Sequence, residues 1–360
     1  VTFELVREVI EMSQLEVLAS RAGEKTAVAY TNITKEDIGL RLGSQDIPLA
    51  LNTVPSVYST GQGGGAGDAR INVRGFNQRN VAVMIDGIPV NDMENGRVYW
   101  SNWMGLIDLT SSVQIQRGLG STSLAVPSAG GTVSVNTRAS EVDPGSGIKM
   151  ALGDNNYQKF TAFHNTGVNE LGGSSSFLLG FWQGDGWRNG MQGEGTTYAF
   201  SVGYTPRGGD HEFNFSLIGA GQWHHQAYYG TQLQDYLDYG PIQGDDYRKF
   251  NQLYREYQAE EFSLLRNYYN KPLATFNWDR EISSRVTLAT SIYGSAGRGG
   301  GTGLRGRGSY GVTAYRESFA EYMDDHSEWR NSDTTINWNV AVQKNAEGAH
   351  VPSSGPFAGM

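Results

Sequence analysis

The sequence contains no cysteine, and no stretch of it approaches the run of about 20 apolar residues that a membrane-spanning helix needs. A helical membrane protein is therefore excluded, and the absence of cysteine is compatible with a place in the cell envelope. The chain also lacks a basic excess, because its formal charge is −9 and its pI is near 5.2. A nucleic-acid-binding protein normally carries a basic face, so nucleic acid is not an expected partner.

The motifs of common enzymes and metal sites are missing as well. Neither a Gly-x-Ser-x-Gly nor a His-Glu-x-x-His motif occurs in the chain. His224 and His225 are adjacent, so on a strand their side chains point to opposite faces and cannot chelate one metal together. The other histidines are isolated in the sequence: His164, His211, His326 and His350. We therefore expect no enzymatic activity, no catalytic residue, no metal and no cofactor.

Glycine is abundant, with 48 residues in 360, and one glycine run resembles a phosphate-binding loop. The segment reads GQGGGAGDARINV over residues 61–73. A P-loop ends in Gly-Lys-Ser/Thr and continues into a helix, and the glycines of a dinucleotide fingerprint also open a helix. This segment has no such lysine and runs into a strand pattern, so it does not predict a phosphate site.

The sequence pattern of the chain changes near EVDPGSG, residues 141–147, where proline and glycine cluster. Before this point, a helix is predicted in TKEDIGLRL with Thr34 as a capping residue. A second helix is predicted in DIPLALNTV, with Asp46 as N-cap and Pro48 in the first turn. Strands are predicted in ARINVRGF, VAVMIDG, VQIQRG and GTVSVNTR. These elements indicate a compact α+β domain.

Glycine has a local role at two places in this domain. Asp86–Gly87 predicts a turn after the strand VAVMI, because glycine accepts backbone angles that a side chain forbids. Gly130–Gly131, ahead of the strand TVSVN, predicts a close approach of two backbones. Both are structural roles.

After Gly147 the apolar residues recur with a period of two. In TYAFSVGYTP, the residues Tyr198, Phe200, Val202 and Tyr204 share one face, and small or polar residues share the other. The same alternation occurs in EFNFSLIGAGQW, and it recurs in TTINWNVAVQ with Ile336, Trp338, Val340 and Val342 on one face. The pattern predicts strands with one apolar, aromatic face and one small, polar face.

A soluble β-sandwich also shows this alternation, so other features must decide. Aromatic residues lie near the strand ends, as in the girdles of outer-membrane barrels, and the opposite face is typical of a wet lumen. The connectors also differ, since TPRGGDH is a tight turn whereas residues 226–271 form a long excursion. Short turns at one end and long loops at the other favour an outer-membrane β-barrel.

The ordered blocks of the N-terminal part resemble the plug domain of the TonB-dependent receptors of Gram-negative outer membranes. The blocks are LEVLASRAG, DIPLALNTVPSV, INVRGFNQRNVAVMIDGIPVND and VQIQRGLGSTSLAVPSAGGTVSVNTR. The resemblance implies an N-terminal extension (1–14), an α+β plug domain (15–140) and then antiparallel transmembrane strands, the N-terminal portion of a β-barrel (147–360). VYWSNW and GSAGRGGGTG look closest to the receptors of Bacteroidetes-type bacteria.

The resemblance also implies functional residues. Arg74 and Arg117 would help to seat the plug against acidic residues of the barrel wall. The outward-facing plug apex would contact substrate through Phe76, Asn77, Gln78, Arg79, Asn91, Asp92, Met93, Glu94, Tyr99, Trp100 and Trp103. Among these, Tyr99, Trp100 and Trp103 would form an aromatic platform. The TonB box would be Leu15, Glu16, Val17, Leu18 and Ala19, although an ordinary first strand of the plug is the alternative for this segment.

The function implied is that of an outer-membrane receptor that binds and actively imports a scarce nutrient, first of all a ferric siderophore. A glycan or peptide importer, or a sensor or structural subunit of an envelope complex that does not transport, is the alternative. The partners implied are TonB, a small-molecule, glycan or peptide ligand, outer-membrane lipid and a surface lipoprotein lid.

The length of the chain departs from the family pattern. A plugged transporter barrel has about 22 strands. Residues 147–360 hold about eight candidate strands of the usual roughly 9 to 11 residues, and they cannot close such a barrel. Open sheet edges are not viable inside lipid, so we expect a fragment or an incompletely traced receptor.

Overall fold

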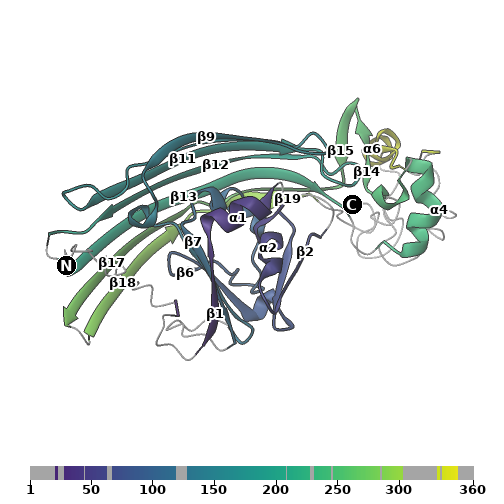
Figure 1. Cartoon of the computed structure of the whole chain (residues 1–360). Helices are drawn as coiled ribbons and strands as arrows, with labels where there is room; N and C mark the ends of the chain where they lie inside the picture. The colour runs from purple at the N-terminus through teal and green to yellow at the C-terminus, as the bar shows by residue number, and fades with distance from the viewer. Residues whose placement is uncertain are drawn as a thin grey trace, which may run out of the picture.

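The computed structural model describes residues 21–22, 28–43, 45–62, 67–118, 128–207, 209–227, 231–244, 246–283, 286–302, 331–332 and 335–347. An N-terminal domain, which ends near Val142, lies against one face of a long, curved sheet (Figure 1). We call this sheet the wall. The N-terminal extension and the TonB box candidate at residues 15–19 lie outside the described residues.

Helix α1 (Lys35–Leu42) begins where the sequence predicts it. The Thr34 hydroxyl accepts a hydrogen bond from the backbone N–H of Asp37 at 3.2 Å, which satisfies one of the free amides of the first turn. Asp37 also places a negative charge at the positive end of the helix dipole. Ile38 and Leu42 turn inward and anchor the helix to the core.

The second helix is shorter than its sequence pattern indicates. Helix α2 (Ile47–Ala50) passes into a 3-10 turn, η1 (Leu51–Thr53). Asp46 is the N-cap residue of α2 and Pro48 lies in its first turn, as predicted, but the Asp46 side chain forms no cap hydrogen bond. The carboxylate instead accepts the backbone N–H groups of Gly67 and Ala69, at 2.8 and 3.0 Å. Asp46 is buried, so it takes the unpaired amides that lie nearest within the core.

Two sheets form the rest of the N-terminal domain. The five-stranded sheet has the order β1 (Ala29–Thr34), β7 (Ser112–Arg117), β8 (Gly131–Asn136), β5 (Val81–Ile85) and β6 (Ile88–Pro89). Only the β5–β8 pair in it is parallel. The three-stranded sheet is β2 (Val57–Thr60), β3 (Arg70–Val73) and β4 (Phe76–Asn77). The four strands predicted for this domain are therefore confirmed.

Short helical turns connect these strands: η2 (Gln78–Asn80), η3 (Trp100–Trp103), α3 (Leu106–Leu109) and η4 (Ala139–Glu141). Asp86 and Gly87 have φ angles of 50° and 84°, which confirms the turn between β5 and β6. Gly131 has a φ of 140°, and a Cβ atom there would lie 2.1 Å from the carbonyl oxygen of Gln116. The close backbone approach predicted at this glycine pair is therefore confirmed.

The wall is a nine-stranded antiparallel sheet. Its strands are β9 (Gly145–Leu152), β10 (Gln158–Asn165), β11 (Gly173–Gly184), β12 (Gly193–Tyr204), β13 (His211–Gln226), β16 (Leu265–Asn270), β17 (Leu273–Ser283), β18 (Val286–Ser295) and β19 (Arg298–Gly301). Strand β13 pairs with β17 along its first half and with β16 along its last residues. Lys271–Pro272 separates β16 from β17, and proline has no N–H to give to the ladder.

The two faces of the wall differ as the period of two predicts. Along β12, residues of odd number are buried, whereas those of even number are exposed or half-buried. The face that carries Thr197 and Ser201 is turned toward the N-terminal domain; we call it the inner face. The outer face carries large apolar residues such as Phe200. Within the described part of the chain, no helix is both long and apolar enough to cross a membrane.

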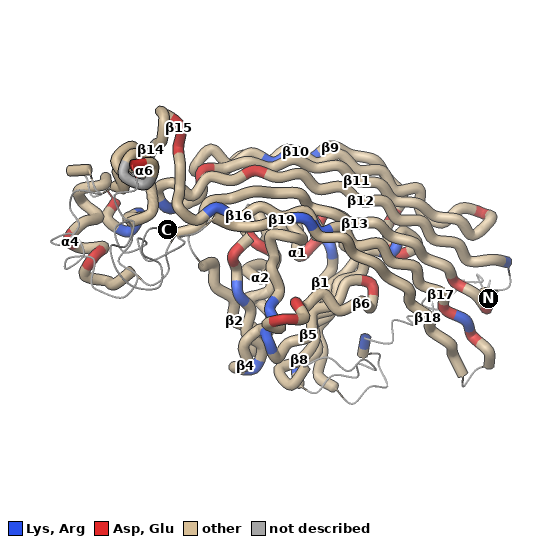
Figure 2. The backbone as a smooth tube through the Cα atoms, turned by 180° about the vertical axis from the view of Figure 1, so that it is seen from behind, with Lys and Arg blue, Asp and Glu red and all other residues tan. Residues whose placement is uncertain are grey.

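Charged residues are unevenly placed in the molecule. Figure 2 shows long stretches of the wall strands without Lys, Arg, Asp or Glu, whereas the N-terminal domain and several strand ends carry both signs of charge. This distribution is expected of strands whose outer face meets lipid.

A small group of elements lies at one end of the wall (Figure 1). It consists of α4 (Leu233–Gln243), η5 (Tyr247–Lys249), the hairpin β14 (Tyr254–Tyr257) and β15 (Glu260–Ser263), and α6 (Trp338–Ala346). Most of it is the long excursion seen in the sequence. We call this end of the wall the loop end and the opposite end, with the shorter connections, the turn end.

The strand predicted in TTINWNVAVQ is wrong, because residues 338–343 of this segment lie in helix α6. Trp338 packs its ring edge-on against Phe262 of β15 at 4.8 Å and joins a cluster with Leu253 and Leu264. The Asn337 side chain accepts the backbone N–H of Val340 at 3.2 Å, which starts the helix. Ile336 and Trp338 thus meet a separate small core, whereas a wall strand would turn them outward.

The tight site at Gly131 predicts a specific loss of stability. We expect Gly131→Ala to destabilise the domain of residues 15–140 by about 2 kcal/mol, because the new methyl group meets the backbone of β7. Gly39→Ala in α1 is the matched control: nothing lies within 4 Å of its added Cβ, and alanine should stabilise the helix by up to about 1 kcal/mol. Urea unfolding of the two variants measures both effects, and equal midpoints would contradict the prediction.

Candidate functional site

The candidate functional site is the interface between the N-terminal domain and the inner face of the wall. Polar contacts occur at three places, which we call the turn-end contact, the middle contact and the loop-end contact. An apolar patch accompanies them, in which the wall residues Leu178, Ala199, Ile218 and Leu273 join the core of the N-terminal domain.

The turn-end contact is centred on Arg138, whose side chain is 3% exposed. Its guanidinium donates to Glu212 Oε1 at 3.2 Å and to Asp279 Oδ2 at 2.9 Å. These carboxylates stand opposite each other on β13 and β17, so the wall presents them as a pair. Burial alone lowers the pKa of Arg138, but the two carboxylates outweigh burial and raise it. The arginine is therefore held charged within a paired, buried site.

Asp86 adds a second element to this contact. Its buried carboxylate accepts the backbone N–H and the hydroxyl of Thr137, at 2.7 and 2.6 Å. It also accepts the hydroxyl of Ser216 on β13 at 3.2 Å. The left-handed conformation of Asp86 in its turn aims this side chain at the wall. Asp86, which the sequence predicts as a turn residue, thus also contacts the wall.

The middle contact has the opposite charge arrangement. Asp108 of α3 forms ion pairs with two lysines of the wall. Its Oδ2 lies 2.5 Å from Lys159 Nζ, and its Oδ1 lies 3.7 Å from Lys149 Nζ. Lys35 of α1 and Lys149 also lie over the ring of Phe163, at 5.6 and 5.5 Å from its centroid. Burial, followed by the charge of Lys149, lowers the pKa of Lys35.

Gly105 allows the N-terminal domain and the wall to come into close contact beside Asp108. The hydroxyl of Thr197 on β12 donates to the carbonyl of Met104 at 2.7 Å. A Cβ atom on Gly105 would lie 2.3 Å from the Thr197 hydroxyl oxygen. Glycine is required here both by this distance and by the φ of 80°.

The loop-end contact is centred on Asp68. Its carboxylate accepts the side-chain amide of Gln226 at 2.9 and 3.2 Å and lies 3.6 Å from His224 Nε2. Nearby, Asp46 holds the backbone of Gly67 and Ala69, and burial raises the pKa of its carboxyl while these two amides lower it. Residues 67–69, directly before β3, are thus held against β13.

A cavity of about 190 Å³ opens beside the loop-end contact. The N-terminal domain contributes Gln45, Asp46, Leu49 and Gly61, and the wall connections contribute Asp154, Asn155, Tyr157, Trp187 and Met191, with Trp182, Gly184, Gly186, Gly193 and His224 completing the lining. We call it the apical cavity. Trp187 is 45% exposed, so its ring is available to a ligand. Burial raises the pKa of Tyr157 to about 12, so its hydroxyl stays protonated and able to donate a hydrogen bond well above neutral pH.

The aromatic platform expected of Tyr99, Trp100 and Trp103 is not formed. Trp100 and Trp103 are only 2% and 4% exposed, because η3 turns both rings into the core. Gly67 closes over this turn: its carbonyl accepts the Ser101 N–H, and a Cβ on it would lie 2.5 Å from that of Ser101. Tyr99 alone remains exposed, at 39%.

The other predicted apex residues do not line the apical cavity. Phe76, Asn77, Arg79, Met93 and Glu94 are exposed, Asn91 and Asp92 are half-buried, and Gln78 is buried. Two of them serve their own loop. Asn91 bonds to the backbone of Val81 and Val83, and Asp92 accepts the N–H groups of Glu94 and Asn95. Their contact with substrate stays a prediction.

Arg74 and Arg117 occupy other surroundings than Arg138. Arg74 is exposed, and its guanidinium lies against Gly118. Arg117 donates to the carbonyl of Tyr30 within the N-terminal domain, at 3.4 Å. Within the described residues, neither forms an ion pair with the wall, so their docking role stays a prediction for wall strands beyond these nine.

Sequence reasoning missed Arg138, although a signal was present. Like Arg74 and Arg117, Arg138 closely follows a strand pattern, here GTVSVN. A glycine follows Arg74 and Arg117, but Ala139 follows Arg138, so the prediction did not include Arg138. Its acidic partners lie 74 and 141 residues away in the chain, so only the fold reveals the cluster.

A compact domain seated against the inner face of a sheet with an apolar outer face defines a plugged outer-membrane receptor. Residues 22–132 match the model of the family described as the TonB-dependent Receptor Plug Domain. The N-terminal domain is therefore a plug domain of the kind found in TonB-dependent receptors, and such receptors lie in the outer membrane. From here on, the N-terminal domain is called the plug.

The similarity to curated proteins is modest and partial. The chain is 29% identical over 143 residues to the ferric enterobactin receptor of Pseudomonas aeruginosa, which covers 36% of this chain and 19% of that protein. It is 26% identical over 189 residues to the vitamin B12 transporter BtuB of Vibrio vulnificus, which covers 50% of this chain and 30% of that protein. The chain therefore spans less than a third of the length of either relative.

Solved structures show the same fold. The unliganded ferric citrate transporter FecA superposes with a TM-score of 0.58 at 19% identity, over 78% of this chain and 42% of that one. The open form of the ferric-catecholate import receptor Fiu from E. coli K12 gives a TM-score of 0.54 at 17% identity, over 76% and 39%. These matches confirm an α+β plug followed by antiparallel barrel strands.

The buried arginine predicts a strong effect of substitution on plug docking. In the full-length receptor in detergent, we expect Arg138→Gln to weaken docking by about 3 kcal/mol, because it leaves Glu212 and Asp279 buried and unpaired. Amide hydrogen exchange in β8 and η4 should become faster. Arg248→Gln is the matched control and should change nothing measurable, since Arg248 is exposed in the loop-end elements and pairs with the half-buried Asp246, away from the plug contacts.

A triple variant tests the cause of this effect. Adding Glu212→Gln and Asp279→Asn to Arg138→Gln removes the uncompensated charges, so most of the lost protection should return. Exchange rates in the triple variant as fast as in the single variant would show that charge pairing is not what seats the plug.

Proposed function

We propose that this chain is part of an outer-membrane receptor that binds and actively imports a scarce nutrient, with a ferric siderophore as the leading candidate. Three similar proteins support this candidate by name: a ferric enterobactin receptor, a ferric citrate transporter and a ferric-catecholate import receptor. Similarity at this level does not carry the substrate to this chain by itself. The argument for import therefore rests on the way the plug is seated.

The observation that carries the proposal is the polar character of the plug–wall contacts. Arg138, Asp108 and Asp68 each reach the wall through ion pairs or hydrogen bonds. When such contacts open in a wet lumen, water replaces the lost partners, so the net free energy of each bond is much smaller than its gross strength. A plug held in this way can be displaced by a modest force and can return, as import through a plugged barrel requires.

Ligand binding is assigned to the apical cavity and the exposed residues around it. In outer-membrane barrels the short turns face the periplasm and the longer loops face the exterior. The loop end of the wall would then face the exterior, and the apical cavity would open there. Trp187 supplies a flat apolar surface, and Asp154 and Tyr157 supply polar groups, a combination that small-molecule sites use.

Energy coupling is assigned to Leu15–Ala19, the TonB box candidate. An extended apolar segment can join the edge of a partner's sheet by main-chain hydrogen bonds. The partner proposed is TonB of the inner-membrane energy-coupling complex. A surface lipoprotein lid over the loop-end elements is a further proposed partner.

The alternative is a receptor for another nutrient, such as a glycan or peptide, or a sensor or structural subunit. The named activity of one relative, a vitamin B12 transporter, favours keeping nutrients other than siderophores under test. Uptake of radiolabelled ferric enterobactin, ferric citrate and cobalamin by cells with and without the intact gene distinguishes these roles. Binding without uptake of any probe would favour the sensor.

The TonB box proposal predicts that binding and uptake can be separated. We expect Leu18→Pro to abolish uptake and leave surface binding of the same ligand unchanged, because proline removes a backbone N–H needed for strand addition. Glu8→Pro, in the N-terminal extension, is the control and should transport normally. Normal uptake by the Leu18→Pro variant would remove the assignment of residues 15–19 as the TonB box.

The apical cavity predicts a role for Trp187 in affinity. We expect Trp187→Ala to weaken binding of the transported ligand roughly tenfold, the effect of losing one aromatic stacking contact. Titration calorimetry on the purified receptor measures this change. Tyr58→Ala is the control, since Tyr58 is 64% exposed on plug strand β2 and does not line the cavity. Unchanged affinity in Trp187→Ala would move the site away from the apical cavity, to the long excursion of residues 226–271.

A further inference from the structure

One buried cation at the loop end takes no part in the plug–wall contacts. Arg188 lies in the connection between β11 and β12, residues 185–192, and only 7% of it is exposed. Its neighbour Trp187 is 45% exposed and lines the apical cavity. Two consecutive residues of one short connection thus have different surroundings, one beside the cavity and one in a packed interior.

The interior around Arg188 belongs to the loop-end elements. The Nε and Nη2 atoms of Arg188 both donate to the main-chain carbonyl of Phe250, at 3.2 and 2.5 Å. The guanidinium carbon lies 5.3 Å from the ring centroid of Tyr236 on α4. Phe250 is itself fully buried, and its ring packs against Tyr236 and Tyr239. The acceptor that Arg188 binds is therefore held in place.

The chemistry of this contact indicates a directional role. Within the described part of the chain, no carboxylate forms an ion pair with Arg188. Burial lowers the pKa of Arg188, and Tyr236 opposes that effect. Burying a cation without a carboxylate costs free energy, and an apolar side chain could fill the same space without this cost. The guanidinium adds two N–H groups aimed at one oxygen, which fix the angle at which the connection meets the loop-end elements.

The residues that follow Arg188 continue the joint to the loop-end elements. The side-chain amide of Asn251 donates to the main-chain carbonyl of Asn189 at 2.7 Å. Gly190 has a φ of 68°, and a Cβ atom on it would lie 2.1 Å from the ring of Tyr254 on β14. The connection and the loop-end elements are therefore in close contact as well as hydrogen-bonded.

The start of the connection is anchored on the other side of the cavity. The N–H of Asp185 donates to the carbonyl of Asn155 at 2.8 Å, and the side-chain amide of Asn156 donates to the carboxylate of Asp185. These partners belong to the connection between β9 and β10, which also lines the apical cavity. Trp187 thus lies between two anchored points, and Arg188 is the larger of them.

We propose that Arg188 is a positioning residue of the apical cavity: by binding the Phe250 carbonyl, it holds the β11–β12 connection in the shape that keeps Trp187 at the cavity. This role rests on the proposed function, in which Trp187 contacts the imported nutrient. The loop-end elements then set ligand affinity without touching the ligand, since no described residue of α4, η5, β14 or β15 lines the cavity.

The position of Trp187 can be measured without a ligand. In the full-length receptor labelled with 5-fluorotryptophan, the fluorine NMR line of Trp187 is identified by its loss in Trp187→Phe. We expect Arg188→Gln to narrow this line and to move it toward that of free 5-fluorotryptophan, because the released indole becomes mobile and exposed to water. The lines of the other tryptophans should stay in place, which shows that the variant is folded.

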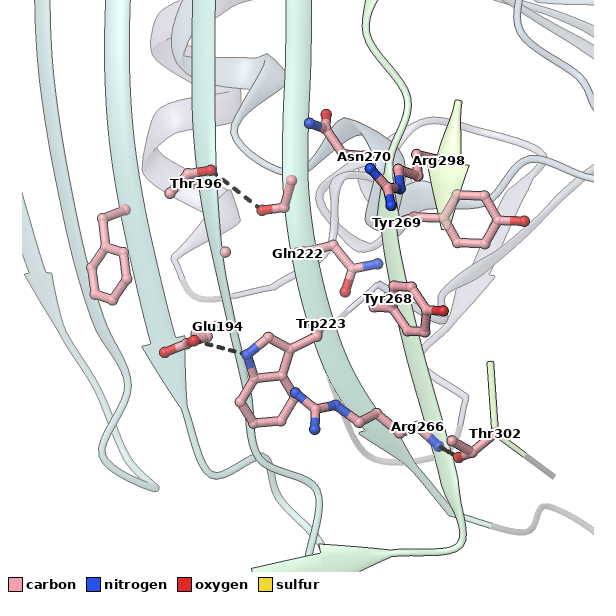
Figure 3. A pocket seen from close by; sticks show the side chains of 13 residues that line it. Glu194, Thr196, Gln222, Trp223, Arg266, Tyr268, Tyr269, Asn270, Arg298 and Thr302 are labelled. Atoms are coloured by element: carbon pink, nitrogen blue, oxygen red, sulfur yellow. Dashed lines mark hydrogen bonds between the residues drawn. The ribbon is translucent and has the colours of Figure 1, made fainter. Parts of the chain in front are cut away.

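Arg266→Gln is the matched control, because it removes the same kind of guanidinium–ring contact elsewhere. The Arg266 guanidinium lies 4.1 Å from the ring centroid of Trp223, in a cavity of about 690 Å³ that Figure 3 shows. His224 faces Asp68 of the plug, so the adjacent Trp223 faces away from the plug. The control should therefore move the line of Trp223 and leave that of Trp187 unchanged.

A lysine variant keeps the test valid if the glutamine variant misfolds. Arg188→Lys retains the charge and a donor for the Phe250 carbonyl but loses the fork of two N–H groups. Its Trp187 line should lie between those of the wild type and Arg188→Gln. A Trp187 line at the wild-type position in folded Arg188→Gln, or in Arg188→Lys if the first variant misfolds, would overturn the positioning role.

Binding measurements show whether Arg188 acts through Trp187. Titration calorimetry uses ferric enterobactin, ferric citrate and cobalamin as probes. For a probe that binds, we expect Arg188→Gln to weaken affinity roughly tenfold, as Trp187→Ala does, and the double variant to bind no more weakly than Trp187→Ala alone. Arg266→Gln should bind normally.

Two outcomes of these titrations would contradict the inference in different ways. A roughly hundredfold loss in the double variant would mean that the two residues act independently, and the positioning role would be wrong. If the Trp187 line moves as expected but Trp187→Ala binds the probe normally, the ligand site of the proposed function is wrong, and Arg188 positions no ligand contact.

Discussion

Side chains alternate between the two faces of a β-strand, and the architecture of this chain depends on that constraint. Every wall strand must present one set of residues to the plug and another to the surroundings of the receptor. On β13, Ser216 and His224 meet the plug, whereas Phe215 and Trp223 face away from it. One strand can therefore serve two environments without a layer between them, but a shift of register by one residue would exchange all of these contacts.

The plug–wall interface combines two kinds of contact with different physical roles. The apolar patch around Ile218 and Leu273 excludes water and adds affinity that does not depend on direction. The ion pairs of Arg138 and Asp108 add little net free energy once desolvation is counted, but they require correct geometry. A small apolar patch with buried charge pairs around it gives a specific seat that is not permanent.

The predictable parts of the fold are those set by local chemistry. The helix at Thr34 follows from one hydroxyl and a nearby amide, and the wall strands follow from their period of two. The position of Asp46 as an N-cap was predictable, but the partners of its carboxylate, Gly67 and Ala69, were not, because they lie more than 20 residues away in the chain. The segment at Ile336 has a strand pattern, but Ile336 and Trp338 pack into a separate small core and a helix begins at Trp338.

The site was less predictable than the fold, for a related reason. Trp100 and Trp103 are of a residue type typical of a binding platform. Whether their side chains are buried depends, however, on the chain segments that cover them. Arg138 and the lining of the apical cavity come together from segments far apart in the sequence. A sequence pattern identifies which residue types are present, and only the tertiary fold determines which of them meet.

The signs of charge along the plug–wall interface have a consequence for how the plug returns after it has moved. At the turn end the plug presents a cation to wall anions, whereas in the middle it presents Asp108 to wall lysines. At the loop end it again presents an acid, Asp68. A plug that re-entered upside down, or slid along the wall by the distance between two contacts, would place like charges together. The order of charges along the interface therefore allows the plug to bind the wall in one orientation only.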